Sequence, residues 1–239
     1  WDQLAREAQW RLAENPSDIG ARVLMAQALY HRGGDLDRSL RLLDEAGALD
    51  PESLAVSVAR AGLLFKAGRT EEARGVLDGM VARSGRFESY LYRADFFEAT
   101  GDLAGAEGDY LLVAGMGDHK AEALKMLGDF YGRHGRVDDA IAVWEKGRVE
   151  FPGQVEFQAN LVEWLGRRNQ GDDLTRATSL LVEMENAFPE DPRLLWARGQ
   201  FLMGRGGSDS KLQALADLER LVDQNPSLVA AHALLVNEA

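Results

Sequence analysis

The stretch LGDFYGRHGRVDDAIAVWEKG, residues 127–147, has glycines near its start, in its middle and at its end, with large apolar residues between them. Glycines in this arrangement are typical either of a loop that binds phosphate or of one copy of a helical repeat. The second half favours a helix, because Val137, Ala140, Ile141 and Trp144 follow the i, i+3, i+4 and i+7 spacing of one helix face. The rest of the chain decides between the two alternatives.

Gly135 in this stretch belongs to a series of glycines with a nearly constant period. Gly34, Gly68, Gly101 and Gly135 are separated by 34, 33 and 34 residues. A glycine at such a position predicts that one helix ends in the left-handed conformation and that another begins. A second series in the same phase consists of small residues that let helices approach closely: Ser39, Ala73, Ala106, Ala140, Ala177 and Ala214. Prolines are tolerated in the first turn of a helix but not inside it, and all six fall at the predicted junctions: Pro16, Pro51, Pro152, Pro189, Pro192 and Pro226.

The repeat predicts a unit of two antiparallel helices, each of about a dozen residues, with no alternating pattern that would favour strands. One such pair cannot bury its apolar face alone, so neighbouring pairs must stack. The last two repeats are each longer, in residues 167–177 and 204–214. We expect these insertions in the turn inside the repeat.

Residues 121–154 resemble the tetratricopeptide repeat family, and nearly the whole chain carries about six copies in phase. The matching residues of this copy are Leu124, Leu127, Gly128, Tyr131, Gly135, Ala140, Trp144, Gly147 and Pro152. Gln27 and Val162 depart from the family pattern, which usually has Gly or Ala there. The resemblance implies an all-α fold, a right-handed superhelix of helix-turn-helix repeats whose concave wall is lined by the first helix of each repeat.

We expect a single solenoid over residues 1–239. The predicted repeats cover residues 17–51, 52–85, 86–118, 119–152, 153–189 and 190–226. Residues 1–16 match the second helix of a preceding repeat, and residues 227–239 match the first helix of a following one. Both terminal helices have an apolar face without a partner, which predicts a fragment of a longer solenoid or self-association through these ends.

The composition argues against several classes of partner. Lys and Arg number 27 against 39 Asp and Glu, and the net charge of −12 repels nucleic acid and anionic membrane surfaces. Without Cys, the chain has neither disulfides nor thiolate metal sites. Its uncharged apolar stretches are shorter than the roughly 20 residues that span a bilayer. The chain starts at Trp1 and not at Met, so we expect that a targeting segment can lie outside it, and the compartment, bacterial periplasm or cytoplasm, stays undetermined.

No set of residues predicts catalysis, a cofactor or a metal. SDSK (208–211) has the Ser-x-x-Lys spacing of penicillin-recognising enzymes, but the other elements of that signature are missing and we expect the stretch in an insertion between helices. GRGG (204–207) lacks the Gly-Lys-Ser/Thr ending of a phosphate loop, and no two of the four histidines have metal-site spacing. The pairs Glu71/Glu72 and Asp138/Asp139 open second helices, where negative charge favours the helix N-terminus. We therefore expect a protein that is not an enzyme.

The resemblance places a partner-binding groove along the first helices. The candidate residues are Leu24, Met25, Phe65, Tyr92, Asp95, Lys125, Asp129, Asn160 and Glu163. The first two repeats offer apolar positions, whereas those of the third to fifth are mostly acidic. This distribution predicts a peptide with apolar side chains toward the N-terminal repeats and a basic segment over the acidic ones. Alternatively, these charges form a solvated face and binding uses the convex side or the loops.

The family's clamp for chaperone tails, with Lys and Asn at set positions, is not reproduced, and of the asparagine ladder of its glycosyltransferase-linked members only Asn160 is present. We therefore expect a protein-interaction scaffold. The Ala- and Gly-rich composition, with Arg preferred over Lys, suggests a bacterial protein, and similar bacterial arrays serve envelope assembly and polysaccharide export. The alternative is a regulatory or substrate-recruiting arm of a larger enzyme.

Overall fold

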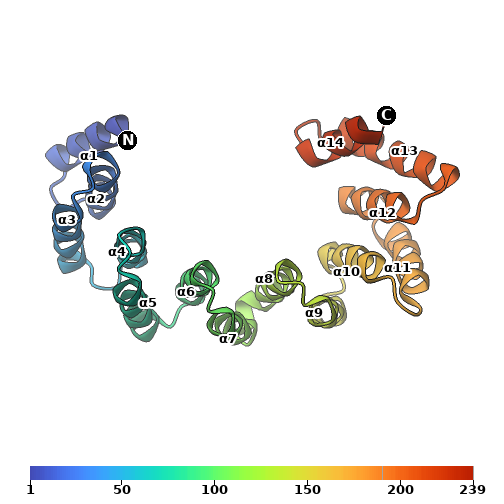
Figure 1. Ribbon diagram of the computed structural model, residues 1–239, viewed down its shortest axis with the longest axis horizontal. Coiled ribbons are helices and arrows are strands. Elements are labelled where there is room, and N and C mark those ends of the chain that lie inside the picture. Colours follow the sequence, from blue (N-terminus) through green and yellow to red (C-terminus); the bar gives the residue numbers. More distant parts are fainter. Residues whose placement is uncertain (190, 239) are drawn as a thin grey trace. The chain divides into compact units, whose positions relative to one another are not determined.

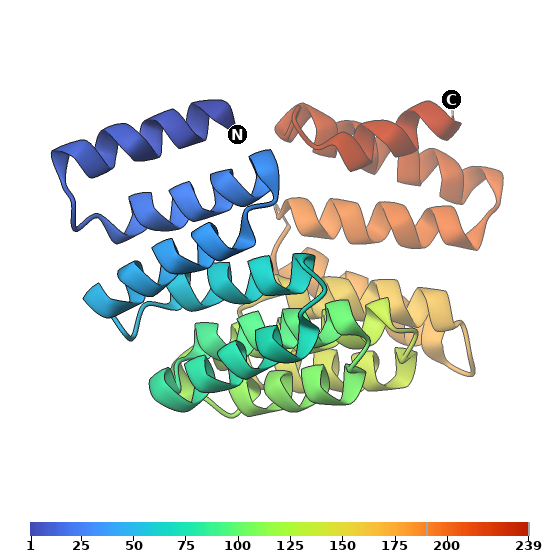
Figure 2. The same ribbon diagram turned by 60° about the vertical axis from the view of Figure 1, so that its left-hand side comes forward.

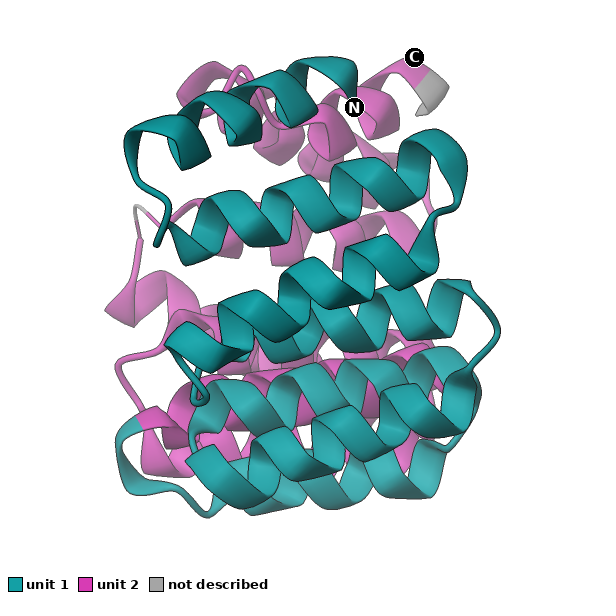
Figure 3. Cartoon of the chain, turned by 90° about the vertical axis from the view of Figure 1, so that its left-hand side faces the viewer, with its two compact units in different colours: residues 1–118 teal, residues 119–239 magenta. Residues whose placement is uncertain are grey.

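The computed structural model describes residues 1–189 and 191–238. The described residues form 14 α-helices and one short 3-10 helix and contain no strand, so the predicted all-α fold of helix pairs is confirmed (Figure 1). The chain divides into two compact units, Trp1–Asp118 and His119–Ala239 (Figure 3).

The first unit consists of one helix followed by three antiparallel pairs. The helices are α1 (Asp2–Glu14), α2 (Ile19–Gly33), α3 (Leu36–Leu49), α4 (Leu54–Lys66), α5 (Thr70–Ser84), α6 (Phe87–Thr100) and α7 (Leu103–Ala114). Each first helix packs on its own second helix, in the pairs α2–α3, α4–α5 and α6–α7, and α1 packs on α2. Figure 2 shows the helices α1 to α5 following one another in a stack. Contacts between α3 and α4 and between α5 and α6 join successive pairs.

The second unit repeats this arrangement and ends with an additional helix. Its helices are α8 (Lys120–Arg133), α9 (Val137–Glu150), α10 (Val155–Arg168), α11 (Asp173–Ala187), α12 (Pro192–Arg205), α13 (Ser208–Gln224) and α14 (Val229–Glu238), and the 3-10 turn η1 (Gly117–His119) precedes α8. The pairs are α8–α9, α10–α11 and α12–α13, and α14 packs on α13. The first helices α10 and α12 also contact each other directly.

The predicted punctuation ends and starts the helices as expected. Gly34, Gly68, Gly101 and Gly135 have φ between 69° and 82°, the left-handed conformation that closes a helix. In the fifth repeat, where this glycine is missing, Asn169 adopts the same conformation with φ of 47°. Five prolines lie outside the helices, and Pro192 is the first residue of α12. Four helix starts are capped by an aspartate: Asp18, Asp35, Asp102 and Asp191 each accept a backbone N–H of the first turn.

Apolar side chains from consecutive helices form the core of each unit. In the first unit, Leu43, Val56 and Leu63 belong to one cluster from α2, α3 and α4, and the next cluster joins α3, α4 and α5. In the second unit, Trp144 is fully buried and its ring packs against that of Phe157 at 5.9 Å between centroids. No helix among the described residues combines the length and apolar character needed to span a bilayer.

One of the two insertions is not where we expected it. The insertion of the fifth repeat does lie in the turn, since α10 ends at Arg168 and α11 begins at Asp173. The insertion of the sixth repeat instead lengthens the second helix: α13 begins at Ser208 and has 17 residues. SDSK therefore forms the first turn of α13 and is not part of an insertion between helices. After the two glycines Gly206 and Gly207, nothing in the sequence from Ser208 onward opposes helix formation.

Candidate partner-binding site

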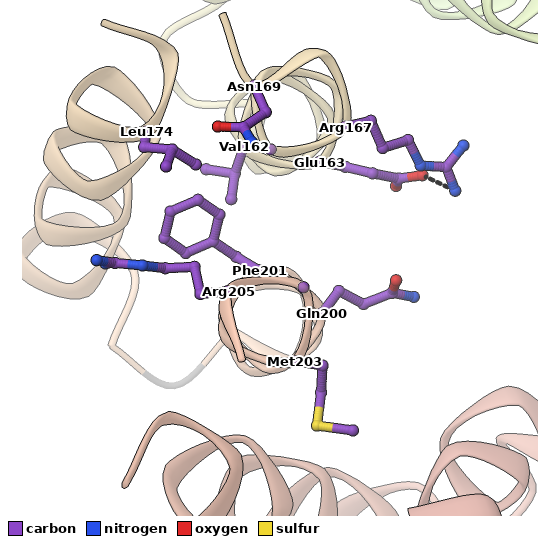
Figure 4. Close-up of a pocket in the computed structure, with 11 residues that line it drawn as sticks. Val162, Glu163, Arg167, Asn169, Leu174, Gln200, Phe201, Met203 and Arg205 are labelled. Atoms are coloured by element: carbon purple, nitrogen blue, oxygen red, sulfur yellow. Dashed lines mark ion pairs between the residues drawn. The ribbon is translucent and has the colours of Figure 1, made fainter. Parts of the chain in front are cut away.

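The described part of the chain contains a pocket of about 640 Å³ where the C-terminal ends of α10 and α12 lie side by side. Its residues come from α10, from α12, from the turn between α10 and α11 and from the start of α11: Val162, Glu163, Gly166, Arg167, Asn169, Leu174, Gln200, Phe201, Met203, Gly204 and Arg205 (Figure 4). The pocket therefore belongs to the first helices of two successive repeats, the elements expected to bind a partner.

The floor of this pocket is apolar, and its rim is polar. Val162 is fully buried and Phe201 is nearly so, and Figure 4 shows the Phe201 ring between Val162 and α12. Val162 is one of the two residues that depart from the usual Gly or Ala of the family pattern. Glycine at position 166 leaves room for the Phe201 ring, since a Cβ there would lie 3.2 Å from Phe201 Cδ2. An apolar side chain of a ligand can thus be covered here while its polar groups meet the rim.

Two arginines and one glutamate line the rim. Arg167 Nη2 lies 2.8 Å from Glu163 Oε1, one helical turn away, and its guanidinium stacks on the Trp164 ring at 5.0 Å from the ring centroid. Arg205 lies over the Phe201 ring, with Cζ at 5.7 Å from the centroid. Figure 4 places Arg205 on the Leu174 side of Phe201 and the Glu163–Arg167 pair and Gln200 on the other side.

The predicted groove residues of the first unit lie on α2, α4 and α6. Leu24 and Met25 on α2 are half-buried. Phe65 and Tyr92 are 36% and 43% exposed, so both rings keep surface for a partner. Phe65 of α4 meets Phe96 of α6 edge to face, with 5.5 Å between ring centroids. Asp95 on α6 is exposed, and the Tyr110 hydroxyl lies 3.4 Å from its carboxylate.

The predicted residues of the second unit lie on α8 and α10. Asp129 is exposed, but partial desolvation by the surrounding protein raises its pKa, and the charges of Arg133 and Lys125, each one turn away on α8, oppose this rise. Asn160 and Glu163 are half-buried on α10, and of the predicted residues Glu163 alone lines the pocket. The carboxylates of this unit therefore have cations beside them, and its first-helix positions are less acidic than the sequence suggested.

Sequence reasoning missed Arg167, Asn169, Gln200 and Arg205. Apart from Phe65, the candidate positions lie in the first three turns of their helices, whereas Arg167, Asn169 and Arg205 lie in the last turn or just after it. Arg167 could have been found, because it follows Glu163 by four residues and such pairs lie on one helix face. Arg205 could not, because its approach to the α10 end depends on how α10 and α12 pack.

The other chemical candidates occupy structural positions. Glu71, Glu72, Asp138 and Asp139 lie in the first turns of α5 and α9, as predicted. Glu72 and Asp139 form ion pairs with Arg69 and Arg136, the residues that precede these helices. No three His, Asp or Glu side chains within residues 1–189 and 191–238 are grouped as for a metal ion.

Comparisons with known proteins agree with this architecture. Residues 33–92 match the family model described as tetratricopeptide repeat. Over 149 residues the chain is 28% identical to cellulose synthase operon protein C of Xanthomonas axonopodis pv. citri, a match that covers 59% of this chain and 10% of that protein. The chain thus spans about a tenth of the length of this curated relative.

Similar solved structures include yeast Tom70, with a TM-score of 0.64 and 18% identity over 98% of this chain and 50% of that one. A tetratricopeptide repeat protein of Parabacteroides merdae has a TM-score of 0.55 and 15% identity, over 98% of this chain and 90% of that one. PilF of Pseudomonas aeruginosa has a TM-score of 0.51 and 13% identity, over 92% of this chain and 97% of that one. The family match and these folds confirm the predicted resemblance.

Proposed function

We propose that this chain, a tetratricopeptide repeat protein, is a non-enzymatic scaffold that binds a protein or peptide partner along its first helices. Repeats of this family imply protein–protein interaction. The observation that carries the proposal is the pocket between α10 and α12, which two successive first helices form and which contains the predicted residue Glu163. A pocket with an apolar floor and a polar rim suits a side chain of a peptide.

We propose the nine predicted groove residues as the binding surface, in two groups. In the first unit these are Leu24, Met25, Phe65, Tyr92 and Asp95. In the second unit they are Lys125, Asp129, Asn160 and Glu163. The exposed rings of Phe65 and Tyr92 favour the first group as a site for apolar side chains, because aromatic residues supply much of the energy of protein interfaces.

We propose that a basic segment of the partner contacts the acidic positions on α6 of the first unit. On α6, Asp95 and Glu98 lie on one side of the helix, and the Tyr110 hydroxyl donates a hydrogen bond to Glu98 at 3.1 Å. On α8, Asp129 is flanked by Lys125 and Arg133, which weaken the local field for a cation. The predicted contact with a basic segment is proposed for α6 because the Asp95 side chain is exposed there.

The scaffold proposal can be tested by capture with matched variants. The purified chain is used as bait for a bacterial envelope extract, and a captured protein is purified and titrated by calorimetry. Tyr92→Ala and Asn160→Ala alter the first helices of the two units. Leu111→Ala and Val149→Ala remove exposed apolar side chains from the second helices α7 and α9 and serve as controls. We expect a loss of affinity of about fivefold or more for the first-helix variants only. Loss confined to the controls would move the binding surface to the second helices.

The bacterial setting that we propose is polysaccharide export or envelope assembly. The support is the similarity to cellulose synthase operon protein C, which is partial and covers a tenth of that protein. If the proposal is right, deletion of the gene lowers the amount of exported polysaccharide and a copy with Tyr92→Ala does not restore it. Unchanged export in the deletion strain would contradict this setting while leaving the scaffold proposal intact.

A second candidate function is a recruiting arm of a larger enzyme. It is favoured by the same comparison, in which the matched relative is far longer than this chain. The full-length gene product decides: a catalytic domain beside the repeats would support the arm.

A further inference from the structure

The pocket between α10 and α12 carries an excess of positive charge in an acidic chain. Its lining contains two arginines and one carboxylate, whereas the chain as a whole has a net charge of −12. Glu163 is the carboxylate, and it is already paired with Arg167 at 2.8 Å. The remaining cation of the pocket is Arg205.

Arg205 has no carboxylate partner among the described residues. The Arg205 guanidinium stacks on the Phe201 ring through its flat face. This contact leaves the N–H groups at its edge available as hydrogen-bond donors. Most other arginines of this chain pair with carboxylates, and Arg93, Arg168 and Arg198 each bind one through two N–H groups. Arg205 therefore keeps the geometry for a bidentate contact and lacks the acceptor.

The surroundings of Arg205 fit a carboxylate that is attached to an apolar chain. Leu174 and the edge of Phe201 form the apolar wall beside it (Figure 4). The Asn169 side chain lines the same pocket, and its position is fixed by the left-handed backbone that closes α10. Neither the Asn169 amide nor the Gln200 amide has a hydrogen-bond partner within the described part of the chain, so both can donate to a ligand.

We propose that this pocket binds a carboxylate of the partner protein next to an apolar side chain, with Arg205 as the residue that recognises it. This inference rests on the proposed scaffold function and adds the chemistry of one contact. It assigns the basic segment and the acidic residue of the partner to different repeats, the former to α6 and the latter to the α10–α12 pocket. Because Arg205 is exposed, the contact should weaken as salt concentration rises.

The test uses short fluorescein-labelled peptides and fluorescence anisotropy with the full chain. Three amidated peptides differ only at the centre, with Leu-Glu-Leu, Leu-Gln-Leu or Leu-Lys-Leu. A fourth carries Leu-Gln-Leu and a free C-terminal carboxylate, which separates a side-chain source of the carboxylate from a chain-terminal one. We expect the Glu peptide, or the peptide with the free terminus, to bind about tenfold more tightly than the amidated Gln peptide.

Three variants test whether Arg205 itself causes the preference for the carboxylate. Arg205→Gln should abolish the preference for the carboxylate, whereas Arg220→Gln, on the exposed face of α13, makes the same change in net charge and should keep it. Glu163→Gln should keep or slightly strengthen the preference, since it removes a negative charge from the rim. Equal effects of Arg205→Gln and Arg220→Gln would show that only net charge matters and would overturn the inference.

Two other results would also overturn it. Tighter binding of the Lys peptide, lost in Glu163→Gln, would mean that Glu163 is the recognising group and the ligand is basic. No binding of any peptide to the wild type would remove the pocket as a peptide site. Either result would remove the pocket as support for the scaffold proposal, and the capture experiment would then decide that proposal separately, because Tyr92→Ala and Asn160→Ala lie outside this pocket.

Discussion

At the scale of single residues, the glycines of α8 and α9 are explained by close contacts with aromatic rings. A Cβ at Gly128 would lie 2.5 Å from Trp144 Cε2, and one at Gly147 would lie 2.1 Å from Phe157 Cε1. Neither glycine has a positive φ, in contrast to Gly135 with φ of 70°. A Cβ at Gly132 would likewise lie 2.3 Å from Trp164 Cζ2. The glycines of the stretch 127–147 thus have two separate causes: helix packing at Gly128, Gly132 and Gly147, and a turn at Gly135.

We predict that Gly128→Ala destabilises the chain by about 1–3 kcal/mol, because the buried Trp144 ring must move to admit the methyl group. The control is Gly108→Ala on α7, an exposed helical position with open space around it. There the better helix propensity of alanine should stabilise by about 0.5–1 kcal/mol. Urea unfolding followed by circular dichroism measures both, and equal stability of Gly128→Ala and wild type would contradict the proposed contact.

Asp173, the first residue of α11, is the most buried carboxylate among the described residues of the second unit, and its contacts hold the fifth repeat together at its insertion. Arg168 donates to both carboxylate oxygens, at 2.8 and 2.6 Å, and the Gln170 backbone N–H donates at 3.0 Å. These contacts, with the Arg168 hydrogen bond as the largest, lower the pKa of Asp173 to about 2. A lowered pKa means that the folded state binds the proton less readily than the unfolded state does.

The contribution of Asp173 to stability should therefore be complete above about pH 4, the unfolded pKa, and should disappear as the pH falls to about 2. Asp173→Asn should cost about 3 kcal/mol at neutral pH and should flatten the loss of stability between these pH values. Asp138→Asn is the control, because Asp138 also pairs with Arg168 but is 86% exposed, and it should change stability by less than about 1 kcal/mol. Parallel pH profiles of Asp173→Asn and wild type would refute the assignment.

At the scale of helices, arginines on two first helices connect three helices each. Arg93 of α6 binds Asp109 of α7 through two hydrogen bonds of 2.8 and 2.7 Å and Asp78 of α5 at 2.8 Å. Hydrogen bonds to Asp109 are the main cause of the raised pKa of Arg93. Arg198 repeats the pattern, with Asp217 on α13 and Glu185 on α11. Each arginine joins its own pair of helices to the preceding pair.

The repeat itself suggests how to replace this ionic contact. The positions equivalent to Arg93 and Asp109 in the fourth repeat hold Leu127 and Val143, each 34 residues later. We predict that Arg93→Leu alone destabilises by about 3–5 kcal/mol, because Asp109 is only 3% exposed and would be left as an unpaired charge. Adding Asp109→Val should restore most of the loss. Thermal and urea unfolding of both single variants and the double variant measure the coupling, and additive losses would show that the two residues act independently.

The helices of this protein could be predicted because their signals are local. The glycine and proline punctuation and the apolar periodicity each lie within one repeat, and the structure agrees with them from α2 to α12. The Arg93–Asp109 pair could not be predicted, because its members are 16 residues apart on different helices and charged residues ordinarily indicate a solvated face. The pocket at Arg205 could not be predicted either, because it depends on the packing of α10 on α12. The start of α13 at Ser208 could not be predicted because Gly206 and Gly207 mark a turn but do not show where the next helix begins.

At the scale of the whole molecule, the two units are alike in content. Each contains three complete helix pairs, which is the number that repeat arrays of this kind need for stability. Each also has its own buried apolar clusters: one runs through Leu43, Val56 and Leu63 in the first unit, and another through Leu195, Leu218 and Leu221 in the second. The stability of such arrays is approximately a sum over repeats and their nearest-neighbour contacts.

We therefore predict that residues 1–118 and residues 119–239, produced as separate chains, each fold. Each should show helical circular dichroism and a cooperative thermal transition, since every helix pair keeps the second helix that covers it. Residues 1–101 provide the matched control, because this cut removes α7 and leaves α6 without the second helix of its pair and Arg93 without Asp109. This shorter chain should melt at a clearly lower temperature than residues 1–118, because the exposed face of α6 adds to the loss of α7 itself. Aggregation of the shorter chain would have the same cause. If residues 1–118 and 1–101 melted alike, α7 would not stabilise the first unit, and the stacking of pairs would not be the source of its stability.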